Sequence, residues 1–269
     1  MRIGLMLRTM DEKQGIGVYT QNLVDELLRQ DPGDEFVLFY RSEEFHGLYE
    51  GHPNVREVVL PAKNKLVWDQ WLIPRAARRE KLDVLFHTKF TVPFLAPCPS
   101  IMSIHGASWF VHPELYSKAD VAYIRTVMPL YCRRAAHIVS NSQLTTDDYI
   151  RILHVRPDKL TTIHLGRNER FRVIEDDHEL AAVRERYRLP QRFLFSVVKY
   201  DPRKNFGNLI DGFRLLLRRC PEAHLVVAGI DCDKYRAEYR LDEDGTAEHV
   251  TFLGWVDQEE LPAIYNLAE

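Results

Sequence analysis

The sequence predicts an α/β protein with two doubly wound, Rossmann-like domains, of which the second is incomplete. Three observations predict it. Short apolar runs alternate with stretches of helical period, a charged stretch interrupts this series at residues 167–192, and a shorter series of the same kind follows. Strands that alternate with helices form βαβ units, whose parallel sheet is covered on both faces. We therefore expect a first domain over 1–166, a connection over 167–192 and a second domain over 193–269.

The first domain is expected to contain strands at each short apolar run and helices between them. Apolar residues from Tyr19 to Leu28 recur at helical spacing, and the turn residues at 31–34 end that helix. Pro74 is expected to kink or break a helix at 66–81. The other expected helices are 121–136, with Pro129 inside it, and 145–153, and the expected strands are 3–7, 36–40, 55–60, 84–86, 101–104, 138–140 and 160–165.

The second domain is expected to be short and to lack part of its sheet. Residues 193–269 are fewer than the ~100–150 residues of a typical domain. Their pattern predicts about three strands, and a sheet of that size with an open edge is only marginally stable on its own. We expect the chain to be either a fragment or a subunit whose second domain another chain completes. The expected strands are 193–198, 225–228 and 250–253, and the expected helices are 206–219 and 259–268.

Composition excludes several classes of protein. The chain has 36 Lys and Arg against 39 Asp and Glu, a net charge of −3, so it lacks the basic excess of a nucleic-acid-binding protein. Its four cysteines form no Cys-x-x-Cys pair, which favours a reducing compartment and no structural metal. No apolar run approaches the ~20 residues of a membrane span. We expect a cytoplasmic protein, at most peripheral to a membrane.

A glycine pair stands between the first strand and the first helix. Gly15, Ile16 and Gly17 lie where a backbone can approach a phosphate and where a helix N-terminus offers free N–H groups. The pattern is not a dinucleotide fingerprint, because Thr20 stands where a third glycine would be needed. A tight strand-to-helix turn explains the same residues, and on spacing alone it is the commoner explanation.

Three further side chains follow strands of the first domain. His105 comes directly after the strand 101–104, at the sheet edge where open α/β sheets place ligands. A histidine there can hydrogen-bond a substrate hydroxyl, or it can simply pack in the interior. His87 and Lys89 follow the strand 84–86 and are weaker candidates for the same edge.

A basic turn follows the first strand of the second domain. Arg203 and Lys204 lie between that strand and the helix that begins near Phe206, and two cations there suit a diphosphate. A solvated turn with Asn205 as the helix N-cap is the alternative. No histidine or cysteine spacing indicates a metal site, so we expect no metal.

The helix at 66–81 carries a local basic excess. Arg75, Arg78, Arg79 and Lys81 stand against a single acidic neighbour, Glu80. Such a patch can touch anionic lipid head groups, but a solvated basic face is the commoner reading. The nearby residues Trp68, Trp71 and Leu72 are expected to pack against the protein.

Five stretches, in order along nearly the whole chain, resemble one known family. They are the glycine loop 15–20, the strands 84–93 with 103–106, the run RRAAHIVSNS at 133–142, the strand and turn 193–205, and the strand, turn and helix 250–268. Together they resemble the family 4 retaining glycosyltransferases, which have the GT-B fold of two Rossmann-like domains. The resemblance implies transfer of a sugar from a nucleotide diphosphate sugar, with retention and without a metal or other cofactor.

The resemblance also implies roles for the candidate residues. Lys204 and Arg203 would hold the donor diphosphate, with Lys199 and Asn205 beside them. The loop Gly15, Ile16 and Gly17 would contact the same phosphates, and His105 would contact the transferred sugar. The sequence departs from the family twice: Lys199 stands where an arginine is frequent, and the family's Glu-x7-Glu stretch would follow residue 269.

The function that the resemblance implies is transfer of a hexose to a glycan or lipid-linked acceptor, in envelope polysaccharide synthesis at the inner membrane face. The alternative is an acceptor-binding or partner subunit, catalytically incomplete until another chain completes the donor site. A nicotinamide oxidoreductase is disfavoured by Thr20 and by Tyr40-Arg41, where an acidic residue would be expected. A nucleotide-sugar epimerase stays open, because a fold does not fix a function.

Overall fold

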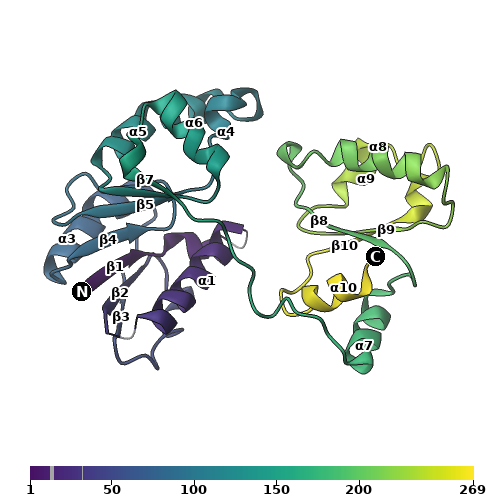
Figure 1. The fold of residues 1–269 in the computed structure, drawn as a ribbon, viewed down its shortest axis with the longest axis horizontal. Coiled ribbons are helices and arrows are strands. Elements are labelled where there is room, and N and C mark those ends of the chain that lie inside the picture. The colour runs from purple at the N-terminus through teal and green to yellow at the C-terminus, as the bar shows by residue number, and fades with distance from the viewer. Residues whose placement is uncertain (13–14, 32) are drawn as a thin grey trace. The chain divides into compact units, whose positions relative to one another are not determined.

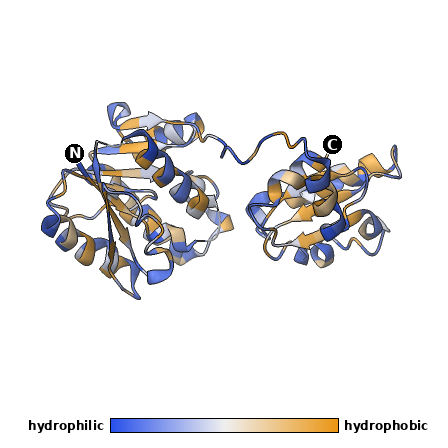
Figure 2. Ribbon diagram, turned by 90° about the horizontal axis from the view of Figure 1, so that it is seen from below, coloured by the Kyte–Doolittle hydropathy of each residue, from blue (hydrophilic) through white to orange (hydrophobic). Residues whose placement is uncertain are grey.

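The computed structural model describes residues 1–12, 15–31 and 33–269 and divides into two compact units, 1–166 and 167–269 (Figure 1). In each unit a parallel sheet carries helices on both faces. The helices present apolar residues on one side and polar residues on the other (Figure 2). The predicted α/β class with two such sheets is confirmed.

The first unit contains a seven-stranded sheet in the order β3-β2-β1-β4-β5-β6-β7. Every neighbouring pair of strands is parallel. The strand order reverses between β1 and β4, and open α/β sheets bind ligands at the carboxyl edge of such a switch point. The strands are β1 (Arg2–Met6), β2 (Glu35–Tyr40), β3 (Val55–Val59), β4 (Val84–His87), β5 (Ser100–Ile104), β6 (His137–Ser140) and β7 (Leu160–Thr162).

Both faces of the sheet are buried at strand β2, which explains why residues 36–40 form an unbroken apolar run. In β2, Leu38 packs into the cluster that contains Val24 of α1 (Gly15–Gln30). Its neighbour Phe39 packs into the opposite cluster with Ile73. Side chains alternate along a strand, so a run that is apolar at every position has a helix layer on each side.

The remaining helices of the first unit cover these two faces. The expected helix at 66–81 is three pieces: α2 (Lys65–Val67), a π-helical turn η3 (Trp68–Leu72) and α3 (Ile73–Arg79). Pro74 falls in the first turn of α3, where a helix does not need its N–H. The others are α4 (Ser108–Val111), α5 (Lys118–Arg134), α6 (Gln143–Leu153) and the short turns η1 (Arg8–Asp11), η2 (Glu43–Phe45), η4 (Pro113–Leu115) and η5 (Pro157–Lys159).

The second unit contains a three-stranded parallel sheet in the order β10-β9-β8. Val227 of β9 packs with the helices α8 and α9, whereas Val226 packs with α7 and α10 on the other face. The elements are α7 (Asp177–Tyr187), β8 (Leu194–Val197), η6 (Pro202–Lys204), α8 (Phe206–Leu217), β9 (Leu225–Ala228), α9 (Lys234–Glu238), η7 (Thr246–His249), β10 (Val250–Gly254) and α10 (Leu261–Leu267).

The charged stretch 167–192 differs from a simple connection, because it belongs to the second unit. It supplies helix α7, and Ile174, Val183 and Leu189 are buried in the cluster shared with α10. Only a few apolar residues of this stretch are buried, and because charged residues surround them the sequence shows no clear apolar pattern here. Within the described residues, no helix has both the length and the apolar character to cross a membrane.

Candidate functional site

The carboxyl ends of the three strands of the second unit meet at one edge. The N–H of Gly229, after β9, donates to the Gly254 carbonyl at 2.7 Å, and Val198 donates to the Ala228 carbonyl at 2.7 Å. Gly229 has φ +138°, and a Cβ there would lie 2.1 Å from the Val198 carbonyl oxygen. Only glycine allows this approach, so the end of β8, where Lys199 begins the next loop, is held against β9.

The basic turn after β8 holds one of its two cations internally. The Asp201 carboxylate accepts from the Arg203 backbone N–H at 3.0 Å and from its guanidinium Nε at 2.9 Å. This pairing lowers the pKa of Asp201 to about 2. The guanidinium of Arg203 is therefore partly neutralised within the turn.

Lys204 is placed differently from Arg203. It is exposed at the end of η6, and the ion pairs found in the described part of the second unit do not include it. Asn205 follows with φ +53°, at the N-terminus of α8, but its side chain makes no capping hydrogen bond. The first turn of α8 contains no acidic residue, so no carboxylate of that turn interacts with its N-terminal amides.

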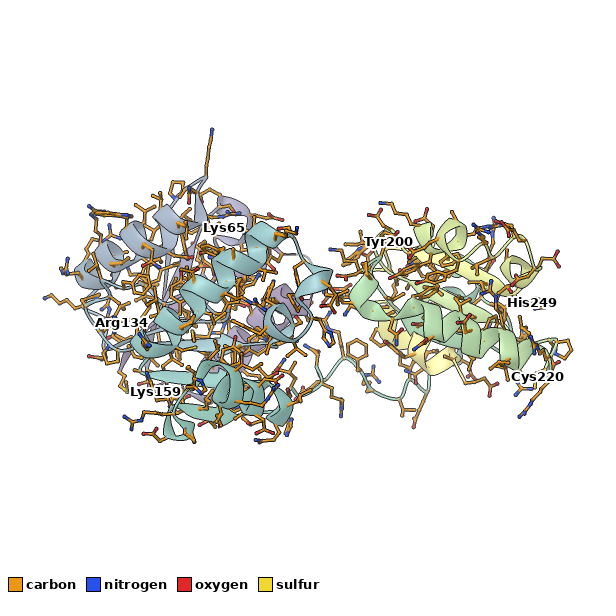
Figure 3. The ribbon with its side chains drawn as sticks, turned by 90° about the horizontal axis from the view of Figure 1, so that it is seen from above. Lys65, Arg134, Lys159, Tyr200, Cys220 and His249 are labelled. Carbon is orange, nitrogen blue, oxygen red and sulfur yellow. The ribbon has the colours of Figure 1, made fainter. Side chains whose placement is uncertain are left out.

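Tyr235 anchors this turn, a role that no local pattern in the sequence predicts. Its hydroxyl accepts from the Asp201 N–H at 2.9 Å and lies 3.0 Å from the carbonyl of Lys199. Its ring stacks on Phe206, the first residue of α8, with centroids 4.0 Å apart. One buried side chain thus fixes both ends of the basic turn; Figure 3 labels Tyr200, whose ring also packs against Tyr235.

In the first unit, His105 lies where predicted, at the carboxyl end of β5. Its Nε2 is 2.8 Å from the Thr88 carbonyl oxygen, so Nε2 carries the proton and donates. The ring packs edge-on against Tyr19, with centroids 4.8 Å apart, and the Tyr19 hydroxyl is 2.9 Å from Ser103 Oγ. Burial lowers the pKa of His105, so the neutral ring keeps Nδ1 as a hydrogen-bond acceptor.

The glycine loop is shaped by a close backbone approach. A Cβ on Gly17 would lie 1.9 Å from the Glu12 carbonyl oxygen, whereas none of the residues that the structure describes comes within 4 Å of a Cβ on Gly15. The backbone carbonyl of Ile16 accepts from Thr20 Oγ1 at 2.8 Å. Gly17 is thus required by the packing of α1 on the preceding turn, and Gly15 stands open at the start of α1.

Thr20, which breaks the dinucleotide pattern, has a structural role. Its hydroxyl lies 2.9 Å from that of Thr9 and 2.8 Å from that of Thr88, and all three residues are fully buried. This hydroxyl cluster joins α1 to the loops after β1 and β4. A glycine at position 20 would remove that link.

Neither of the weaker candidates, His87 and Lys89, has an exposed side chain. His87 is fully buried in the central strand β4, in register with Met6 and Met102, and its Nδ1 contacts the backbone of Thr91. Burial holds the pKa of His87 well below its ordinary value. Lys89 forms an ion pair with Glu12 at 2.7 Å.

A buried ion pair joins Arg8 and Asp69 near the carboxyl end of β1, and the sequence did not predict it. Arg8, just after β1, donates from Nε to Asp69 at 2.9 Å and from a terminal nitrogen at 3.2 Å, and it also contacts Thr91 Oγ1 at 3.2 Å. Asp69 lies in the π-helical turn η3, and π-helical turns are frequent at functional sites. The local sequence contains no signal for either partner.

The structure thus brings Lys199, Arg203, Lys204 and Asn205 to one edge of the second unit. It places Gly15 and His105 near the carboxyl edge of the first unit, linked through Tyr19 on α1. Within the described residues, no group of three or more His, Cys, Asp or Glu side chains is arranged to hold a metal ion.

Comparisons with known proteins show the family and the fold of the chain. The pattern of Glycosyltransferase Family 4 matches residues 13–171, and that of Glycosyl transferases group 1 matches residues 181–269. The chain therefore belongs to glycosyltransferase family 4, and the predicted family is confirmed. It is 25% identical over 196 residues to O-antigen chain mannosyltransferase B of Escherichia coli, covering 71% of this chain and 51% of that protein. The chain thus spans about half the length of this curated relative.

Solved structures confirm the GT-B-like fold. Anabaena Alr3699/HepE, solved in complex with UDP-glucose, is 17% identical with a TM-score of 0.69, covering 98% of this chain and 71% of that one. The UDP-GlcNAc 2-epimerase of Methanocaldococcus jannaschii is also similar, at 12% identity and a TM-score of 0.58, covering 100% of this chain and 77% of that one. Because one fold serves both activities, the family patterns and not the fold distinguish a transferase from an epimerase.

Proposed function

We propose that this protein is a retaining glycosyltransferase that transfers a hexose from a nucleotide diphosphate sugar to a glycan or lipid-linked acceptor. The bond from the sugar C1 to the diphosphate breaks, a bond to an acceptor hydroxyl oxygen forms, and a nucleoside diphosphate leaves. Membership of the family and the mannosyltransferase relative support this reading. The comparisons do not favour the alternative of a partner subunit.

The basic turn at the end of β8 is the observation that carries the proposal. Negative charge develops on the diphosphate as it leaves, and a fixed cation or a set of amides lowers the energy of that state. Lys204 supplies an ammonium that no carboxylate of the described chain neutralises, and the first turn of α8 supplies open N–H groups. Lys199 and Asn205 flank this position, and Arg203 adds charge when it leaves Asp201. In this proposal no metal ion is needed.

His105 has the second role in the proposed reaction. Its Nε2 proton is held by the Thr88 carbonyl, so Nδ1 is available to accept a hydrogen bond from a hydroxyl of the transferred sugar. Gly15, without a side chain and open at the start of α1, lets backbone approach the donor phosphates. We assign no contact with substrate to His87 or Lys89.

The test is transfer from defined nucleotide sugars. The purified protein is mixed with GDP-mannose or UDP-glucose and with octyl α-mannoside as a simple lipid-like acceptor, in the presence of EDTA, and the products are followed by proton NMR. The expected result is an α-linked product and release of the nucleoside diphosphate. A β-linked product from an α-linked donor would contradict retention, loss of activity in EDTA would contradict the metal-free reaction, and no transfer from any nucleotide sugar would contradict the proposal as a whole.

Replacement of His105 tests its proposed contact. His105→Ala is expected to lower turnover about tenfold, the value of one hydrogen bond to substrate, while the melting temperature changes little. The acid limb of the pH profile should also disappear. In the wild type, burial lowers the pKa of His105, so the neutral ring is protonated and loses its acceptor only below the ordinary histidine range. His112→Ala, at an exposed histidine of the same unit, is the control. A variant that fails to fold would favour a purely structural role.

A further inference from the structure

The His105 imidazole contacts both a backbone carbonyl and an aromatic ring. Its Nε2 donates to the Thr88 carbonyl at 2.8 Å, and its ring packs against that of Tyr19, with centroids 4.8 Å apart and planes at 77°. The hydrogen bond determines which nitrogen carries the proton, but by itself it lets the imidazole turn about the axis of that bond. The direction in which Nδ1 points therefore depends on the contact with Tyr19.

Tyr19 is itself fixed by a hydrogen bond to the strand that precedes His105. Its hydroxyl lies 2.9 Å from Oγ of Ser103, which is 1% exposed in β5. Side chains two residues apart on a strand lie on the same face, which explains how one tyrosine reaches both Ser103 and His105. The hydroxyl of Tyr19 thus anchors the ring that packs against the imidazole.

The helix α1, which carries Tyr19, is held in place by buried contacts. The next residue, Thr20, is fully buried, and its hydroxyl is 2.8 Å from that of Thr88, whose carbonyl accepts from the imidazole. Gly17 approaches the Glu12 carbonyl oxygen so closely that a Cβ there would lie 1.9 Å from it. Because α1 is packed against Glu12 and against the loop after β4, the position of its tyrosine is fixed.

The surroundings keep both rings neutral. Burial raises the pKa of Tyr19 and lowers that of His105, so both side chains are uncharged near neutral pH. The charged groups that act on the imidazole are Lys89, which lowers the His105 pKa, and Glu12, which raises it, and they form an ion pair with each other at 2.7 Å. Tyr19 therefore orients a neutral imidazole by packing and not by charge.

We propose that Tyr19 is a positioning residue, which holds the His105 imidazole so that Nδ1 faces the transferred sugar. The inference rests on the proposed function of His105, and Tyr19 acts through that ring without touching the substrate. A hydrogen bond weakens steeply when its geometry is poor, so an imidazole that can turn would contact the sugar less well in the transition state. Binding of the donor diphosphate by the basic turn of the second unit would stay unchanged.

The contact is tested by proton NMR titration of the His105 ring in the whole chain, without substrate. Its signal is identified by its absence in His105→Ala. In Tyr19→Leu the midpoint should rise by about half a pH unit or more, because the ring that shields the imidazole from water is removed. Tyr19→Phe keeps the ring and should titrate like the wild type. Tyr19→Met is a second variant without the ring, in case Tyr19→Leu does not fold, and an unchanged midpoint in the folded ringless variant would overturn the proposal.

The role in the reaction is tested by a double-mutant cycle with His105→Ala. Tyr19→Leu is expected to lower kcat about fivefold, the size of an aromatic contact, and to leave the KM for the nucleotide sugar within about twofold. In the His105→Ala background the same substitution should have no further effect on kcat, because Tyr19 acts only through that ring. A further loss of the same size in this background would overturn the proposal.

Tyr49→Leu is the matched control. Tyr49 is a buried tyrosine of the same unit, whose hydroxyl donates to Asp25 at 2.7 Å and whose ring packs against His52. This variant should lower the melting temperature at least as much as Tyr19→Leu, but leave the His105 midpoint and kcat unchanged. An equal change in both variants would overturn the proposal. Absence of sugar transfer by the wild type would overturn the proposed function as well, whereas transfer with an unresponsive midpoint would overturn this proposal alone.

Discussion

Lys204→Ala is expected to lower turnover about 100-fold or more, with folding unchanged. The Lys204 ammonium is exposed at the end of η6, just before α8, and no carboxylate of the described chain neutralises it. Loss of a main charge stabiliser at a leaving group has an effect of this size. Turnover is measured as release of nucleoside diphosphate at saturating donor. Because the side chain is exposed and makes no ion pair, the melting temperature should stay within error of the wild type.

The matched control is Lys234→Ala. Lys234 is exposed in the same unit, but its ammonium is paired with Asp231 at 3.0 Å. A general effect of lost positive charge would lower the activity of both variants. If Lys204→Ala keeps near-normal turnover, or if Lys234→Ala loses as much, Lys204 does not stabilise the leaving group.

Asp69→Ala is expected to destabilise the first unit by about 3–5 kcal/mol. The substitution leaves the Arg8 guanidinium buried without its carboxylate, and an uncompensated buried charge has a cost of this order. Burial raises the pKa of Asp69 and outweighs the attraction of Arg8, so the pair contributes little by itself, whereas breaking it is costly. The free energy of unfolding is measured by urea denaturation.

Two controls show whether the effect comes from the unpaired charge. The double variant Arg8→Met with Asp69→Leu removes both charges and should recover most of the lost stability. Asp158→Ala breaks the exposed pair with Arg156 and should have no measurable effect on unfolding. A double variant as unstable as Asp69→Ala would show that packing, and not charge, sets the stability here.

Much of the fold could be predicted because a buried strand or helix face leaves a regular pattern of apolar residues in the sequence. The run at 36–40 is apolar at every position because both faces of β2 are buried. Helix α7 was harder to predict, because its buried positions around Val183 are few and charged residues surround them. The π-helical turn at Trp68–Leu72 has no local signature, since tertiary packing of Trp68 and Asp69 determines it.

The candidate site was only partly predictable, because the sequence shows which residues follow a strand but not which distant residues hold them in place. His105 directly follows β5 and Lys204 lies in the turn between β8 and α8, so strand–helix alternation places both at the carboxyl ends of strands. The side chains that hold these positions come from distant segments: Tyr235 lies about thirty residues after the turn it anchors, and Asp69 lies 61 residues from Arg8. No spacing rule connects such partners, because the fold alone brings them together.

In the proposed function the turn after β8 binds the donor diphosphate without a metal. The most direct measurement is a calorimetric titration of the protein with GDP and with UDP in EDTA, comparing the wild type with Lys204→Ala and Lys234→Ala. We expect one-to-one binding of at least one nucleotide by the wild type and by Lys234→Ala, and binding at least tenfold weaker by Lys204→Ala. Equal affinity in all three proteins, or binding that requires a divalent cation, would contradict it.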